Sequence, residues 1–157
     1  MVGVTIKEER KVSNSIQDVL NKQIASWTVL YVKLHNYHWY VKGSQFFTLH
    51  LKFEEFYNEA ALNVDNLAER LLALGGKPVA TMKGCMELAQ IREASGNETA
   101  EQMVAEISAD FTSLIGDLKK GMAQAQSEGD ETTADMLLAI HSALEKHVWM
   151  LQSFLGK

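Results

Sequence analysis

The sequence contains few of the residues that interrupt helices or mark an exported protein. Proline occurs once, at Pro78, and cysteine once, at Cys85, among 157 residues. A single cysteine cannot form an internal disulfide, which favours a reducing, cytoplasmic environment. No uncharged apolar run reaches the roughly 18 residues that a membrane helix needs. Residues 1–14 are charged and no apolar stretch lies behind them, so we expect neither a signal peptide nor a membrane span.

Positive charge is also scarce, because 15 Lys and Arg residues face 20 Asp and Glu residues and leave a net charge of −5. Sequence-independent binding of nucleic acid needs a positive field, so the body of the protein is a poor candidate for it. Several site motifs are missing as well. The chain lacks the Glu-x-x-His pairs of a single-chain di-iron bundle, the His-Glu-x-x-His pattern of zinc proteases, glycine-rich phosphate loops and paired cysteines.

The apolar residues, 46% of the chain, recur at steps of three and four, which is the spacing of helices. This pattern predicts four long helices over residues 13–41, 46–74, 99–126 and 131–155, and a short one over residues 83–90. Gly75 and Gly76 end the second helix, and Thr99 opens the third with a capping-box pattern. Residues 78–97 form a long central connection, so we expect an all-α four-helix bundle with a crossover. Residues 1–12 would be a short tail and residues 13–157 a single domain.

Four residues of types that bind metals are spread along the first two predicted helices: His38, His50, Asp65 and Glu69. His50 and the two carboxylates lie on one uninterrupted helix. Fifteen residues separate His50 from Asp65, and at the rise of an α-helix this is about 22 Å. One copy of the chain therefore cannot gather all four around one metal. If they share a site, two chains must build it.

A helical wheel of the second helix separates these carboxylates from the core stripe. Glu54, Asp65 and Glu69 fall about 40° to 100° from His50, beside the stripe but outside it. The same face carries apolar residues, namely Phe47, Leu51, Ala61, Leu62 and Leu72. A second face that mixes apolar groups with carboxylates favours a partner helix there.

Two-fold pairing of this helix with its own copy would bring the four residues together. An antiparallel crossing near residues 58–59 sets His50 of one chain beside the Asp65 and Glu69 of the other. His38 and His50 are both six residues from the turn at Ser44, so they can face each other across it. Two imidazoles and two carboxylates suit a divalent transition metal such as iron, with open positions for an oxidant.

Each residue also has an ordinary structural interpretation when it is taken singly. A histidine on an apolar helix face is usually a core residue with a hydrogen-bond partner, and Asp65 with Glu69 at i, i+4 is usually a solvated pair. His35, one turn before His38, is interpreted as a surface residue in preference to a support of the metal ligands. The metal-site hypothesis gains weight because one symmetry operation satisfies all four positions.

Three segments together resemble the Dps family, the miniferritins named as DNA-binding proteins from starved cells. They are the segment 38–43, His-Trp-Tyr-Val-Lys-Gly; the segment 46–50, Phe-Phe-Thr-Leu-His; and the segment 65–70, Asp-Asn-Leu-Ala-Glu-Arg. The resemblance extends over nearly the whole chain and implies a ferritin-like four-helix bundle. It also implies a hollow homododecamer that oxidises Fe(II), preferably with hydrogen peroxide rather than oxygen, and stores Fe(III), which protects the cell from oxidative damage.

The same resemblance assigns further roles. His38 and His50 of one subunit, with Asp65 and Glu69 of its two-fold mate, would form a di-iron ferroxidase centre, with Glu54 as an additional acidic ligand. Trp39 would be the near-site tryptophan that intercepts oxidising equivalents. At the start of the last helix, the pore-lining acids of the family match Glu131 and Asp135, with Asp130 as a weaker candidate.

DNA binding is the family property that we do not expect here. In members that bind DNA it often depends on a lysine-rich tail, whereas residues 1–12 carry three basic and two acidic groups. We therefore predict weak or no DNA binding. Two alternatives stay open: a DNA-compacting protein whose metal site is secondary, and an assembly whose site holds zinc or another metal that does not turn over.

Overall fold

The computed structural model describes residues 15–157, and within them the chain is entirely helical apart from turns and connections. The helices are α1 (Ile16–Tyr40), α2 (Phe46–Ala73), α3 (Met82–Leu88), α4 (Ala100–Ser127) and α5 (Glu131–Phe154). The all-α prediction is confirmed, and the four long helices begin and end within three residues of the predicted bounds. The predicted tail, residues 1–12, lies outside the described residues.

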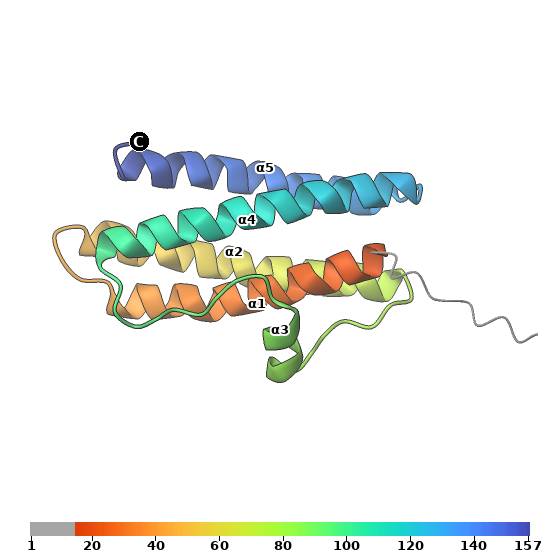
Figure 1. Cartoon of the computed structure of the whole chain (residues 1–157), viewed down its shortest axis with the longest axis horizontal. Coiled ribbons are helices and arrows are strands. Elements are labelled where there is room, and N and C mark those ends of the chain that lie inside the picture. Colours follow the sequence, from red (N-terminus) through yellow and green to blue (C-terminus); the bar gives the residue numbers. More distant parts are fainter. Residues whose placement is uncertain (1–14) are drawn as a thin grey trace, which may run out of the picture.

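The four long helices form two antiparallel hairpins that pack into a bundle (Figure 1). α2 packs mainly on α1, and α5 packs mainly on α4. The connection between α2 and α4 runs back along the length of the bundle, and its short helix α3 rests on α1 (Figure 1). This crossover makes α2 and α4 parallel, which is the ferritin-like order of helices.

Local sequence signals account for where the helices begin and end. Ser15 caps α1 by accepting a hydrogen bond from the backbone N–H of Asp18 at 3.3 Å. Thr99 forms the predicted capping box with Gln102 at the start of α4. α2 ends before Gly75, whose φ of 77° is the left-handed conformation that favours glycine. These caps explain why the boundaries could be predicted closely.

The core runs along the bundle axis and is built from large apolar side chains of all four long helices. The largest fully buried ones include Trp27, Tyr37, Phe53 and Phe111. On α2 the buried residues include Phe53, Ala60, Leu67 and Leu71, at the helical spacing of a core stripe, together with Phe56 and Asn63. Lys33 of α1 is 2% exposed and ion-pairs with Asp110 of α4 at 2.6 Å, so a charged cross-link lies inside the bundle.

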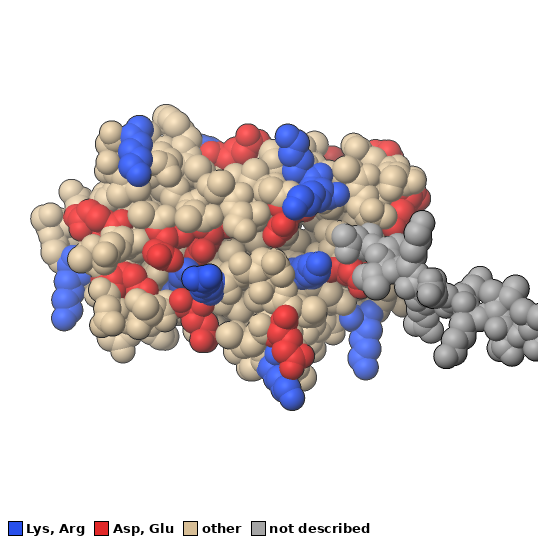
Figure 2. All heavy atoms as spheres, in the orientation of Figure 1, with Lys and Arg blue, Asp and Glu red and all other residues tan. Residues whose placement is uncertain are grey.

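The surface mixes both signs of charge. On the face drawn in Figure 2, acidic and basic side chains lie among each other over α1, α4 and the connection. None of the helices described between residues 15 and 157 combines the length and apolar character needed to cross a membrane.

Candidate metal centre

His38 and His50 lie against each other where α1 ends and α2 begins. Their imidazole rings stack with centroids 3.7 Å apart and an angle of 14° between the planes. His38 Nδ1 is 2.6 Å from the backbone oxygen of His50, and His50 Nδ1 is 2.7 Å from the backbone oxygen of His38. The two histidines predicted to face each other across the turn are thus brought together by a reciprocal pair of hydrogen bonds.

This reciprocal pair fixes the tautomer of both neutral rings. A backbone carbonyl can only accept a hydrogen bond, so each Nδ1 must carry the proton and donate it. In a neutral imidazole the other nitrogen, Nε2, then keeps its lone pair. A histidine that ligates a metal commonly donates its second ring N–H to a carbonyl or carboxylate, which fixes its tautomer and orientation. Both imidazoles are therefore prepared to bind a metal through Nε2.

Aromatic side chains surround the histidine pair and restrict its motion. Phe46 stacks on the His50 ring with centroids 4.9 Å apart. The Tyr57 ring meets the His38 ring edge-on at 5.3 Å, and His35 stacks on the other side of Tyr57 at 3.7 Å. His35, which was interpreted as a surface residue, is instead half-buried and donates from Nδ1 to the Tyr31 carbonyl at 2.8 Å. It supports the surroundings of the histidine pair through Tyr57.

Glu54 is half-buried one turn after His50, and the hydroxyl of Tyr57 lies 3.5 Å from its Oε1. Burial, and then the negative charge of Glu54, raise the pKa of Tyr57, so this tyrosine stays protonated. Trp39, in contrast, is 67% exposed, and its ring centroid lies 5.2 Å from that of His35. The structure therefore places Trp39 beside the same group of aromatic rings, at its outer edge.

Asp65 and Glu69 are exposed on α2 and lie apart from the histidines. Within residues 15–157, no three His, Cys, Asp or Glu side chains are close enough to hold one metal ion. The face of α2 that carries the two carboxylates also exposes Phe47, Leu51, Leu62 and Leu72, with Phe47 at 86%. One chain thus presents a histidine pair at one end of an open, partly apolar helix face and a carboxylate pair toward the other end.

The start of α5 presents two of the three predicted pore acids to solvent. Glu131 and Asp135 are exposed, whereas Asp130 is engaged within the chain. Asp130 caps α5 by accepting from Thr133 N, and it ion-pairs with Arg70 of α2 at 2.8 Å. Burial alone would raise the pKa of Asp130. The hydrogen bonds from Thr133 and the charge of Arg70 outweigh burial and hold that pKa below its usual value. Asp130 is thus ionised, and its charge is balanced by Arg70.

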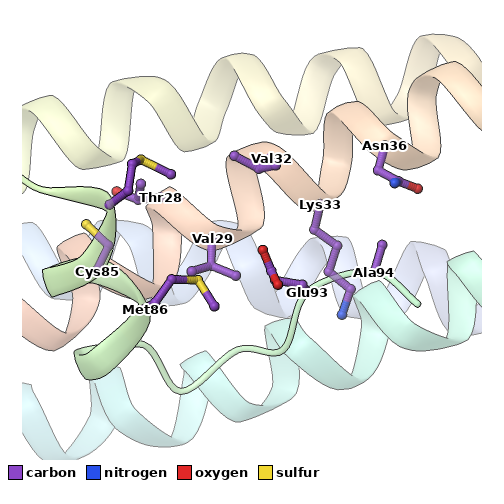
Figure 3. Close-up of a pocket in the computed structure, with 10 residues that line it drawn as sticks. Thr28, Val29, Val32, Lys33, Asn36, Cys85, Met86, Glu93 and Ala94 are labelled. Carbon is purple, nitrogen blue, oxygen red and sulfur yellow. The ribbon is translucent and has the colours of Figure 1, made fainter. Parts of the chain in front are cut away.

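A cavity of about 180 Å³ lies elsewhere, between α1, α3 and the connection that follows α3 (Figure 3). It is lined by Val32, Lys33, Cys85, Met86 and Glu93, among others, and by none of the predicted ligands. Cys85 is buried here, at 4% exposure. Met86, which also lines the cavity, is 46% exposed on α3.

Comparisons with known proteins agree with this architecture. The ferritin-like domain family, Ferritin, matches residues 17–157. General stress protein 20U of Bacillus subtilis is 63% identical over 144 residues, which are 92% of this chain and 99% of that protein. DNA protection during starvation protein 2 of Bacillus anthracis is 57% identical over 145 residues, again 92% and 99%.

Solved structures of Dps proteins share the fold closely. A Dps protein from Bacillus brevis matches with a TM-score of 0.89 at 54% identity, over 89% of this chain and 94% of that one. Dps from Listeria monocytogenes matches with a TM-score of 0.91 at 38% identity, over 93% and 96%. The chain therefore belongs to the ferritin-like proteins and, among them, to the Dps miniferritin family.

Proposed function

We propose that this protein is a ferroxidase and iron store that assembles into a hollow dodecamer. The observation that carries the proposal is the histidine pair, in which each Nδ1 donates to the other's backbone carbonyl and each Nε2 is left to bind a metal. The pair lies at the end of a helix face that exposes both apolar groups and two carboxylates. A second copy packed on that face by a two-fold axis would complete the ligand set with its own Asp65 and Glu69.

The substrate of this centre would be Fe(II). Imidazole nitrogens and carboxylate oxygens suit iron, and the carboxylates become stronger ligands as the charge of the iron rises to Fe(III). Two Fe(II) ions supply the two electrons that reduce one hydrogen peroxide, with two protons, to two water molecules. Because both electrons are taken in one site, peroxide is consumed without release of a hydroxyl radical. Glu54, half-buried beside the histidines, is placed to serve as a further oxygen ligand.

Other residues support this chemistry from farther away. Trp39 is the aromatic group at the outer edge of the site and would give up an electron when an oxidising equivalent escapes the iron. Glu131 and Asp135, exposed at the start of α5, would line the pores through which Fe(II) enters the shell. Asp130 contributes little to such a pore, because Arg70 already balances its charge.

The direct test mixes anaerobic Fe(II) with the protein, adds peroxide and follows the absorbance of Fe(III). We expect rapid oxidation by the unaltered protein and a loss of most of that rate when His38→Ala is combined with Asp65→Ala. An unchanged rate in the double variant would show that these residues are not the site. Binding of iron without oxidation would favour the alternative of a site that binds a metal but does not turn over. Binding of zinc as readily as iron would favour the same alternative. Light scattering should give about 210 kDa, twelve times the 17.6 kDa chain.

Protection of DNA would follow from this chemistry without contact with DNA. Removal of Fe(II) and peroxide prevents the formation of hydroxyl radicals, and the net charge of −5 works against binding to phosphate. We expect weak or no retention of DNA in a gel-shift assay at low salt. Tight, salt-dependent retention by the assembled protein would instead support the DNA-compacting alternative.

A further inference from the structure

Arg70 of α2 is held by a closed ring of hydrogen bonds at the start of α5. Its Nη2 donates to Asp130 Oδ1 at 2.8 Å, and its Nε donates to Thr133 Oγ1 at 2.9 Å. The Thr133 hydroxyl in turn donates to the other oxygen of Asp130, whose Oδ1 also accepts from Thr133 N. Thr133 is fully buried, and the side chains of Arg70 and Asp130 are only 19% and 15% exposed. The guanidinium group is thus fixed in position.

This ring links α2 to α5, which belong to different hairpins and meet across the shared core of the bundle. α2 packs mainly on α1, and α5 packs mainly on α4, so side chains must set how α2 is turned relative to α5. A second link, between Glu59 Oε2 and His147 Nε2 at 2.7 Å, connects the same two helices farther along. Glu59 and Arg70 are eleven residues apart, or about three turns, and therefore lie on one face of α2.

The two proposed carboxylate ligands lie on α2 between Glu59 and Arg70. Glu69 directly precedes Arg70 and points about 100° away from it around the helix, and Asp65, five residues before Arg70, points about 140° away. A rotation of α2 about its own axis would swing both carboxylates, and the Arg70 ring opposes that rotation at the turn that carries Glu69. The Glu59 link acts two to three turns farther from Glu69.

The geometry points to Arg70 as a positioning residue for the carboxylate half of the metal centre. Through Asp130 and Thr133 it sets the direction in which Asp65 and Glu69 leave α2. The bond to Asp130 also occupies the Arg70 cation, which keeps it from pairing with the carboxylates that should receive iron. This inference rests on the proposed function, because it concerns the same site.

The test compares three variants of the assembled protein with a matched control. Arg70→Ala removes the ring. Arg70→Lys keeps the charge but loses the two-donor fork, and Asp130→Asn keeps a good helix cap but releases Arg70. Glu59→Gln weakens the other α2–α5 link and serves as the control. Each protein is titrated with Co(II), a redox-inert probe followed by its visible absorbance, and assayed for the KM and kcat of Fe(II) oxidation.

We expect Arg70→Ala to weaken Co(II) binding and raise the KM for Fe(II) by about fivefold to tenfold, with a smaller change in kcat. The effect falls on KM because the ring positions ligands before iron arrives. Arg70→Lys should recover part of the affinity, and Asp130→Asn should also raise the KM. Glu59→Gln should lower thermal stability and leave both constants within about twofold.

Equal effects of Arg70→Ala and Glu59→Gln on stability and on Co(II) affinity would show that Arg70 is merely structural. Unchanged Co(II) affinity in Arg70→Ala would overturn the inference while leaving the proposed function intact, provided the unaltered protein oxidises Fe(II). If the unaltered protein neither binds Co(II) nor oxidises Fe(II), the proposed function fails and the inference fails with it. Should Arg70→Ala not assemble, Arg70→Lys and Asp130→Asn carry the same comparison.

Discussion

A site shared between two chains predicts that two inactive variants restore activity when they assemble together. His50→Ala removes a ligand from the histidine half, and Glu69→Ala removes one from the carboxylate half. In a dimer with one chain of each kind, one site takes its histidines from the Glu69→Ala chain and its carboxylates from the His50→Ala chain. That site has no defect, and the second site has both.

The size of the recovery follows from this geometry. A random one-to-one mixture gives about half mixed dimers, and each has one intact site of two, so about one quarter of all sites should be active. The His50→Ala chain should keep its local structure, because His38 donates to the backbone oxygen of residue 50, which the substitution retains. The substitution removes the hydrogen bond from His50 Nδ1 to the His38 carbonyl and the stacking of the His50 ring on His38 and Phe46.

The assay reassembles the two variants from dissociated chains and measures the initial rate of Fe(III) formation per chain. Mass spectrometry of the assembled particles verifies that they contain both chains. A matched control mixes His38→Ala with His50→Ala. Both of these defects lie in the histidine half, so every site in a mixed dimer has a defective histidine pair and no activity should return.

Recovery near one quarter with the first mixture and none with the control supports a shared site. No recovery in proven mixed particles would show that one chain supplies all its own ligands, and the two-fold reasoning would be wrong. Equal recovery in both mixtures would mean that one site takes its two histidines from different chains.

Three further predictions concern stability. Phe53→Ala, at a fully buried core position, should cost about 3–5 kcal/mol of unfolding free energy and lower the melting temperature seen by calorimetry. Thr99→Ala removes the cap of α4 and should cost about 1 kcal/mol by denaturant titration, with faster amide exchange confined to the first turn. Burial opposes ionisation of Glu98, but hydrogen bonds from Ser95 and Gly96 outweigh it and lower its pKa to about 2. Glu98 therefore stabilises the fold above the unfolded-state pKa of 4.5, and this contribution disappears as the pH falls to about 2. Glu98→Gln should cost about 1 kcal/mol at pH 7, after allowance for solvent screening, and almost nothing near pH 2; an equal cost at both would contradict the assignment.

The fold could be predicted closely because its determinants are local. Helix spacing, the capping box at Thr99 and the glycines after α2 are all visible in short stretches of sequence. The buried polar groups could not be predicted in this way. From the sequence alone, Lys33 would be predicted to lie on the surface. In the structure it is buried, and the carboxylate of Asp110, 77 residues later, lies 2.6 Å from its Nζ. An amphipathic pattern depends only on the residue types within a short window, so it contains no information about a partner so distant in sequence.

The pairing of the two histidines could be predicted from the sequence, but the groups that hold their rings could not. Their equal distance from the turn at Ser44 could be counted in the sequence. The acceptors, in contrast, are backbone carbonyls, which every residue possesses and which therefore give no signal. The ion pair between Asp130 and Arg70 was missed for a different reason. Arg70 stands next to Glu69 in the sequence, where it could equally be a surface cation, and only the packing of α2 beside α5 directs it to Asp130.

The position of His38 at a helix end explains how the orientation of the His50 ring is achieved at little cost. The last carbonyls of a helix have no partner within it, and His38 lies in the last turn of α1. His50 Nδ1 donates to the carbonyl of His38, so one hydrogen bond both satisfies a helix end and fixes the tautomer of the His50 ring. The His50 carbonyl, in contrast, lies inside α2 and also accepts a helix hydrogen bond, so His38 Nδ1 donates to its second lone pair. Under the proposed two-fold pairing, folding would orient the imidazoles, and assembly would bring the partner chain's carboxylates to them. Ferroxidase activity should therefore appear with the dimer and be absent from isolated folded chains, which size-separated species assayed at increasing dilution would reveal.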